Sequence, residues 1–88
     1  MSRASYEDYK QLKIPMASRQ EDRLFRKFGQ RCNQIRNEKG LTQEAMADYG
    51  FSTRFYQRIE AGKPIHLRTV FKLARAFKVS LAELFTGI

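Results

Sequence analysis

The sequence predicts an all-α domain of five helices, preceded by a short N-terminal arm. Three observations predict this fold: helix-capping sequences recur along the chain, apolar residues recur between them every three to four residues, and no stretch shows the alternation of a strand. A chain of 88 residues is one small domain, too small for a large enzyme cleft. We therefore divide the chain into an arm over residues 1–17 and a compact helical domain over residues 18–88.

The first helix is expected over residues 19–39. Ser18 and Glu21 have the spacing of a capping box, in which each side chain caps the backbone of the other. Gly40 is expected to end the helix in a left-handed conformation. Apolar residues recur along this stretch and are expected to form its inner face: Leu24, Phe28, Cys32 and Ile35.

Two short helices are expected next, joined by a turn at Gly50. Thr42 can cap the first of them and Ser52 the second, which is expected over residues 52–61 and is followed by Gly62. Glycine permits the sharp change of direction between them, so the pair predicts a helix-turn-helix. On the second helix of the pair, one side is apolar and is expected to anchor it to the core: Phe51, Tyr56 and Ile59.

A fourth and a fifth helix complete the predicted fold. The fourth is expected over residues 67–77, with His66 as a weak cap. Its predicted inner face consists of Leu67, Val70, Phe71, Ala74 and Phe77. Ser80 and Glu83 form a second capping box, so a short fifth helix is expected to run to the C-terminus.

The charge balance favours a polyanionic partner. The chain has 17 Lys and Arg against nine Asp and Glu, a net charge of +8. Residues 1–22 contain four residues of each sign, whereas residues 23–88 contain 13 basic and five acidic residues. The whole excess therefore lies in the helical domain, as in proteins that bind nucleic acid.

Neither a metal, a cofactor nor an enzyme active site is expected. Cys32 and His66 are the only residues of their types and have no companions at metal-ligand spacing. The chain also has no glycine-rich phosphate loop and no paired carboxylates in a cleft. Cys32 lies on an apolar stripe, which favours a core position over a redox sensor. No apolar run approaches the roughly 20 residues of a membrane span, and no signal peptide is apparent, so we expect a cytoplasmic protein.

The polar side of the third helix is the candidate binding surface. It carries Thr53, Arg54, Gln57 and Arg58. In a major groove, arginine can pair with guanine, glutamine with adenine, and the threonine methyl group can contact thymine. The alternative is an ordinary solvated helix face.

Residues 24–85 resemble the helix-turn-helix domain of the xenobiotic-response-element family, which includes phage lambda-type repressors and Cro. The resemblance is carried by three stretches: FGQRCNQIRNEKGLTQEAMA, GFSTRFYQRIEAGK and LRTVFKLARAFKVSLAELF. It implies a five-helix fold and a transcriptional regulator that binds operator DNA sequence-specifically. Two spacings are one residue shorter than is usual in the family, in MADYGFS and in GKPIHLRT.

The resemblance also implies roles for individual residues. It implies base contacts from Thr53, Arg54 and Arg58, with Gln57 beside them. It implies contacts to the DNA backbone from Gln43, Ser52, Phe55, Lys63 and His66. Phe55 could instead fill the core, and the sequence permits both. Arg36 and Glu60 are expected to form a structural ion pair between the first and third helices.

The last helix carries more apolar residues than a short terminal helix needs: Leu81, Leu84, Phe85 and Ile88. They form either a homodimer interface or a cap over the monomer core, and both remain open. A dimer would place two recognition helices about 34 Å apart and predicts an inverted-repeat operator.

A second hypothesis is a protein-interaction module such as an antitoxin. Its partner would bind the arm over residues 1–17, which contains Tyr6, Tyr9, Leu12 and Ile14. RNA binding is disfavoured because no sheet of exposed aromatic residues is expected.

Overall fold

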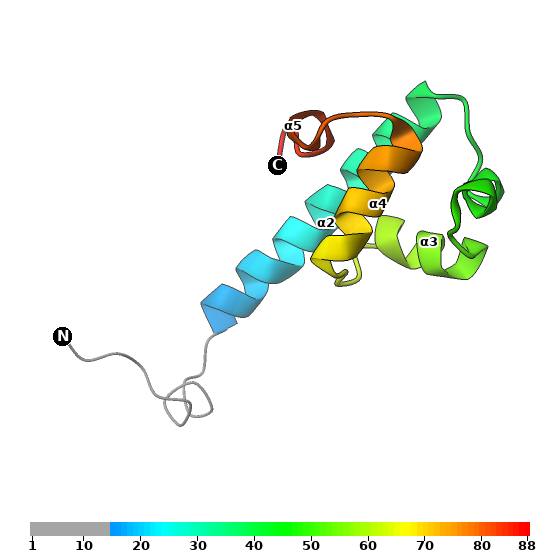
Figure 1. Ribbon diagram of the computed structural model, residues 1–88. Helices are drawn as coiled ribbons and strands as arrows, with labels where there is room; N and C mark the ends of the chain where they lie inside the picture. The colour runs from blue at the N-terminus through cyan, green and yellow to red at the C-terminus, as the bar shows by residue number, and fades with distance from the viewer. Residues whose placement is uncertain (1–14) are drawn as a thin grey trace.

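A computed structural model of the protein describes residues 15–88, with side chains from residue 19 onward. The described residues form four α-helices and one 3-10 helix, and no strand. In chain order these are α2 (Pro15–Glu38), η1 (Glu44–Tyr49), α3 (Thr53–Glu60), α4 (Leu67–Phe77) and α5 (Leu81–Leu84), as Figure 1 shows. The predicted all-α fold is confirmed. Residues 1–14 of the arm, which were expected to bind a partner, lie outside the described residues. Residues 15–17 belong to α2.

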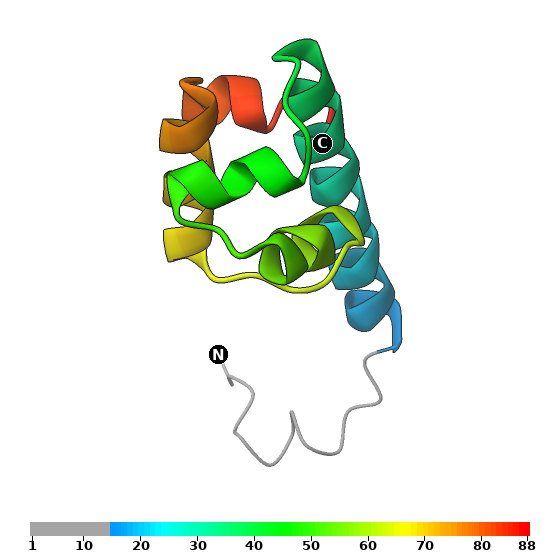
Figure 2. The same cartoon turned by 90° about the vertical axis from the view of Figure 1, so that its right-hand side faces the viewer.

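All five elements contribute side chains to one core. In Figure 2, η1 and α3 span the space between α2 and α4. The buried apolar side chains are Phe28, Cys32, Ile35, Met46, Phe51, Tyr56, Ile59, Val70, Leu73, Ala74, Ala76, Phe77 and Leu84. Because removing apolar surface from water is the main favourable term in folding, this cluster holds the short helices in place.

The first helix begins earlier than expected. It starts at Pro15, so the capping box predicted at Ser18 is wrong. Proline lacks an N–H and has a fixed φ, which suits the first helical position, where the N–H would have no helical partner. The N-terminal half of α2 extends beyond the other helices (Figure 1). Leu24, expected inside, is 48% exposed there, and that prediction is also wrong.

The inner face of α4 differs from the predicted one at two positions. Leu67 and Phe71 are 69% and 44% exposed, whereas Leu73, which was not predicted, is fully buried. The buried face follows Val70, Leu73, Ala74 and Phe77, and Phe71 lies about 100° around the helix from Val70. Leu67 is the first residue of the helix and lies at the margin of that face.

Hydrogen bonds fix both ends of η1, the first helix of the helix-turn-helix. Thr42 Oγ1 accepts a hydrogen bond from the Ala45 N–H at 3.0 Å, as expected of a cap. Gly50 ends η1 in the left-handed region, with φ of 87°, a conformation that glycine adopts without strain. The Lys72 Nζ atom donates to the Gly50 carbonyl at 2.5 Å and lies 4.5 Å from the centre of the Phe51 ring. One side chain of α4 therefore fixes the turn.

The short spacing in MADYGFS, residues 46–52, has a structural counterpart. Glu44–Tyr49 is a 3-10 helix, with bonds such as that from the Met46 N–H to the Gln43 carbonyl. A 3-10 helix rises about 2.0 Å per residue against about 1.5 Å for an α-helix. The six residues of η1 therefore span the same distance as an α-helix with more residues, which compensates for the residue that is missing relative to the family.

Helices α2 and α3 approach each other closely at Gly29. A Cβ atom at this position would lie 2.5 Å from the Ile59 carbonyl oxygen and 2.7 Å from that of Glu60. Both neighbours are backbone atoms of α3, which cannot rotate away. Glycine therefore sets the distance between the two helices.

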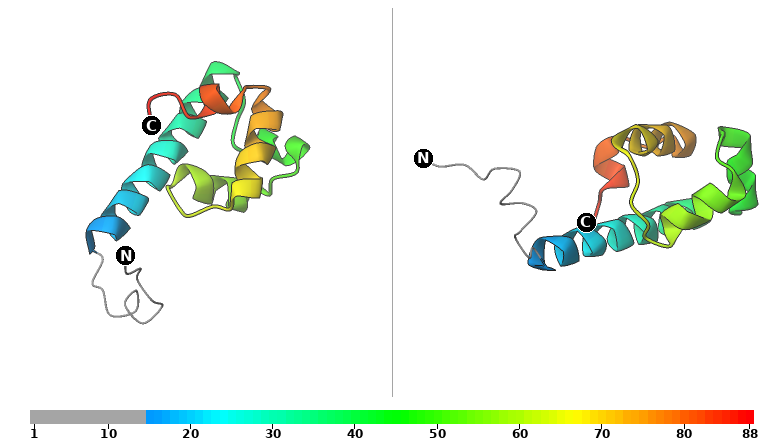
Figure 3. Two further views of the ribbon diagram at one scale, coloured as in Figure 1. Left: turned by 60° about the vertical axis from the view of Figure 1, so that its left-hand side comes forward. Right: turned by 90° about the horizontal axis from the view of Figure 1, so that it is seen from below.

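The last helix is tied to α2 and ends at Leu84, so the prediction that it runs to the C-terminus is wrong. Its predicted capping box is confirmed, because Ser80 Oγ accepts from the Glu83 N–H at 3.0 Å and Glu83 Oε1 accepts from the Ser80 N–H at 3.1 Å. The Arg31 Nε and Nη2 atoms donate to the Glu83 carbonyl at 3.1 and 2.6 Å. The right-hand view of Figure 3 shows the C-terminal segment beside α2. Leu84 is fully buried in the core.

Candidate nucleic-acid interface

Helix α3 has a buried side and an exposed side. Ser52 caps it through its Oγ atom, which accepts from the Phe55 N–H at 3.1 Å. Tyr56 and Ile59 are buried, as is Phe51 just before the helix, so the predicted anchors are confirmed. The outward side consists of Arg54, Gln57 and Arg58, which are exposed, and Thr53, which is half-buried. The buried side thus anchors α3 to the core, and the opposite side exposes polar side chains to solvent.

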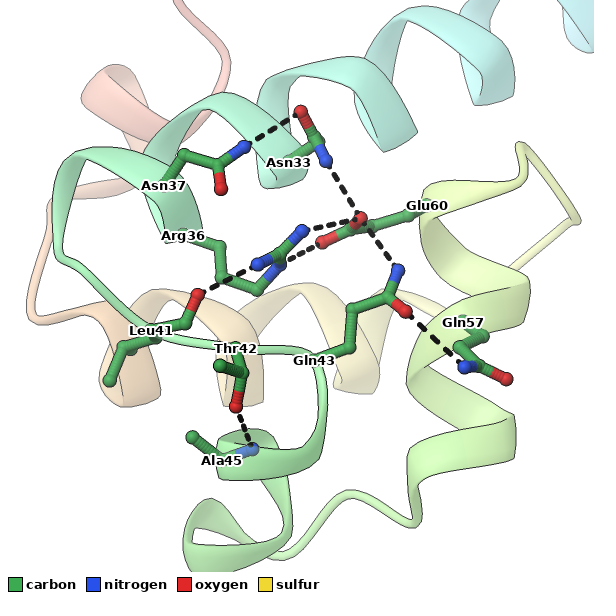
Figure 4. A network of polar contacts seen from close by, with 9 residues as sticks. All are labelled: Asn33, Arg36, Asn37, Leu41, Thr42, Gln43, Ala45, Gln57 and Glu60. Carbon is green, nitrogen blue, oxygen red and sulfur yellow. Dashed lines mark hydrogen bonds and ion pairs between the residues drawn. The ribbon is translucent and has the colours of Figure 1, made fainter.

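Glu60 joins three elements at the C-terminal end of α3 (Figure 4). Its Oε2 atom accepts from the Arg36 Nε atom at 2.6 Å, and Oε1 accepts from Arg36 Nη2 at 3.3 Å. The Oε1 atom also accepts from Asn33 Nδ2 and from Gln43 Nε2, each at 3.0 Å. The Arg36–Glu60 ion pair is therefore present, with both side chains at most 10% exposed. It orients α3 relative to α2 and η1.

Gln43 links this junction to the exposed side of α3. Its Oε1 atom accepts from Gln57 Nε2 at 3.3 Å, while its own Nε2 atom donates to Glu60. An amide nitrogen carries two N–H groups, and Gln43 uses one of them for Glu60 (Figure 4). The second is available to a ligand.

The ionisation of the junction follows from its hydrogen bonds. Burial alone would raise the pKa of Glu60, but hydrogen bonds to its carboxylate, first of all that from Arg36, lower this pKa to about 2. The carboxylate is therefore charged at neutral pH and keeps its donors. The neighbouring Tyr56 hydroxyl makes no hydrogen bond of ordinary geometry within the described residues, and burial beside Glu60 raises its pKa.

Four of the five residues expected at the DNA backbone lie near the two ends of α3, and the fifth, Gln43, precedes η1. Ser52 and Phe55 belong to the start of α3, and Lys63 and His66 lie exposed between α3 and α4. Phe55 is 43% exposed, so the alternative that it fills the core is wrong. Its ring lies parallel to that of Phe51, with the ring centres 6.2 Å apart.

A family model described as helix-turn-helix matches residues 33–84. The chain belongs to this family. The match covers η1, α3, α4 and α5 completely and includes the C-terminal part of α2. This helix-turn-helix domain is of the xenobiotic-response-element type, which implies DNA binding, and the family is not known to be catalytic. Neither a curated protein nor a solved structure matches the chain.

Sequence patterns missed two side chains that position the helix-turn-helix. Asn33 lies three residues before Arg36 on α2, so helical spacing could have placed it beside the ion pair. Lys72 reaches the Gly50 carbonyl across 22 residues, and no local pattern indicates such a contact. Both stabilise the motif from outside it.

Redox or metal chemistry would have to involve groups such as Cys32 and the acidic side chains. Burial raises the pKa of Cys32 to about 12, so its thiol is protonated and inert as a redox nucleophile. Within residues 15–88, no group of three His, Cys, Asp or Glu residues could hold a metal ion. None of the described helices is long and apolar enough to span a bilayer.

Proposed function

We propose that the protein is a transcriptional regulator that binds specific DNA sequences by placing α3 in the major groove. The observation that carries this proposal is the two-sided structure of α3. Its exposed side offers Arg54, Gln57 and Arg58, while Tyr56 and Ile59 hold it to the core. A rigid helix with outward hydrogen-bond donors is what direct reading of base edges requires.

Base contacts are assigned to Thr53, Arg54, Gln57 and Arg58. Arg54 and Arg58 make no side-chain hydrogen bond within the described residues, so their guanidinium groups are available for guanine edges. Gln57 starts from a defined orientation because it donates to Gln43. A side chain that is already held loses less entropy on binding.

Contacts to the DNA backbone are assigned to Gln43, Ser52, Phe55, Lys63 and His66. Gln43 keeps one amide N–H beyond its bond to Glu60, and this N–H can reach a phosphate. Lys63 supplies charge from the loop after α3, and Phe55 supplies an exposed ring against a sugar. Such contacts fix the register of a protein on the duplex but carry no sequence information.

A homodimer is part of this proposal. Leu81, Phe85 and Ile88 are each 36–40% exposed near the C-terminus, which supports an apolar patch there. Leu84 was expected in this patch, but it is fully buried and belongs to the core. A two-fold dimer would set two α3 helices one duplex turn apart, about 34 Å, on an inverted repeat.

Selection from a random duplex library tests the proposal. The purified protein is incubated with the library at physiological salt, and the retained duplexes are sequenced. We expect an inverted repeat with half-sites near one helical turn apart. Retention that disappears with added salt and yields no motif would mean that the basic surface binds phosphates only, and would contradict the proposal.

A further inference from the structure

An apolar groove lies on the side of α2 that faces α4 and the C-terminal segment. We name it the α2–α4 groove; its volume is about 250 Å³, and its lining includes Leu24, Phe28, Ile65, Leu67 and Phe85. Leu67 is 69% exposed, Leu24 48% and Phe85 39%. Large apolar side chains gathered in one hollow at this exposure are typical of an interaction surface.

The groove has the dimensions of a docking site for side chains. Its volume is below the roughly 300 Å³ at which pockets for small molecules begin, and no polar side chain lines it. Specific small-molecule sites need a few polar groups to fix the orientation of the ligand. The groove instead suits two or three apolar side chains from one face of a helix, the arrangement of helix-in-groove recognition.

Positive charge borders the groove along α2. Lys27 and Arg31 lie three and seven residues after Leu24, so they follow it along the same side of the helix. Both residues also line a shallow cavity of about 210 Å³ between α2 and residues 86–88. Arg31 donates to the Glu83 carbonyl and to the Gln34 side chain. Hydrogen bonds with Ser80 and, to a smaller extent, the positive charge of Arg31 lower the pKa of Glu83. Two exposed acidic residues, Glu21 and Asp22, precede Leu24 on α2.

We propose that the α2–α4 groove binds an acidic amphipathic helix of a partner protein. Apolar side chains of that helix would enter beside Leu24 and Leu67, and its carboxylates would meet Lys27 and Arg31. The positive rim formed by Lys27 and Arg31 is complementary to an acidic partner, and this complementarity is the reason for choosing such a helix as the occupant.

The groove is separate from the DNA-binding surface. Its lining residues come from α2, α4 and the segments that flank α4 and α5, and none belongs to η1 or α3. DNA and a partner helix can therefore be bound together, although Phe85 belongs both to the groove and to the patch assigned to the homodimer. Failure of one proposal leaves the other standing, since binding in the groove is measured without DNA.

The test uses two labelled synthetic peptides of about four helical turns and the full chain. Both peptides carry leucines on one face; the first has glutamates at the remaining positions, and the second has lysines there. Binding is followed by fluorescence anisotropy at physiological salt. The test variant is Leu24→Ser with Leu67→Ser, and Phe71→Ser is the control, because Phe71 is 44% exposed but does not line the groove.

We expect the glutamate peptide to bind the native chain about tenfold more tightly than the lysine peptide, a difference of about 1.4 kcal/mol. The double variant should lose about tenfold in affinity, and Phe71→Ser should change it by less than about twofold. Circular dichroism checks that each variant is folded, which is expected because Leu24 and Leu67 are exposed.

Three results would overturn the proposal. The first is equal or absent binding of both peptides, and the second is equal affinity of the native chain and the double variant. The third is binding only after residues 1–14 are deleted, which would make the chain's own N-terminus the occupant. Sedimentation of the free chain adds a further check, since a native dimer that the double variant separates would make a second copy the occupant.

Discussion

The junction around Glu60 and the exposed side of α3 are parts of the same helix, but they differ in how their polar groups are satisfied. At the junction, Glu60 accepts hydrogen bonds from Arg36, Asn33 and Gln43 (Figure 4). On the exposed side, Arg54 and Arg58 make no side-chain hydrogen bond within the described residues. The comparison shows that side chains that donate hydrogen bonds within the protein hold α3 in place, whereas side chains without such bonds can donate to a ligand. Substitutions at the junction should change stability, and those on the exposed side should change binding.

The largest loss of stability is expected from Gly29→Ala. The added Cβ would lie 2.5 Å from the Ile59 carbonyl oxygen, so α3 must move away from α2. We expect a loss of about 3 kcal/mol in the free energy of unfolding, measured by urea denaturation. Gln30→Ala, an exposed neighbour on α2, is the control and should be nearly neutral. A stable Gly29→Ala protein with native DNA binding would show that this close approach is not needed.

Loss of the Glu60 charge should follow in size. We expect Glu60→Gln to lose about 2 kcal/mol in the free energy of unfolding, because Arg36 keeps its buried charge without a partner. Glu38→Gln, an exposed change on α2, is the control.

The same variant makes a prediction about pH. The pKa of Glu60 is about 2 in the folded protein against 4.5 as the reference value. Its contribution to stability is therefore complete above pH 4.5 and is lost as the pH falls from 4.5 towards 2. Melting temperatures across this window should fall more steeply for the native chain than for Glu60→Gln. Parallel curves would refute the role given to the carboxylate.

An intermediate effect is expected at the N-terminal cap of α3, at the end of the helix opposite to Glu60. Ser52→Ala removes the acceptor for the Phe55 N–H and should lose about 1 kcal/mol in the free energy of unfolding. Ser52→Asn provides the matched control, since asparagine caps helices as well as serine does. Equal losses in both variants would mean that the hydroxyl does more than cap the helix.

The sequence predicted best what depends on neighbouring residues. The caps at Ser52 and Ser80 and the turn at Gly50 follow from interactions within four residues, and all three are confirmed. The exposed side of α3 was also predictable, because it follows from helical periodicity around Tyr56 and Ile59.

What the sequence did not predict depends on distant contacts. Gly29 matters only because α3 returns to it about 30 residues later along the chain, and Lys72 reaches Gly50 in the same way. Leu24 belongs to an apolar stripe, but α2 extends beyond the core that would have covered it. The hydrogen bonds of Gln43 needed the relative placement of three elements, which no local pattern supplies.

The smallest effect on stability is expected from Arg54→Ala. The same variant gives the most direct test of the role proposed for α3. Arg54 is exposed, so the free energy of unfolding should change by less than about 0.5 kcal/mol. Arg75→Ala, an exposed arginine on α4 outside the proposed interface, is the charge-matched control.

The decisive measurement is the affinity of Arg54→Ala for the selected duplex and for a random duplex at the same salt concentration. The account predicts a loss of about 1–3 kcal/mol on the selected duplex and a much smaller loss on the random one. Equal losses on both duplexes, matching those of Arg75→Ala, would contradict the claim that the exposed side of α3 reads the base sequence.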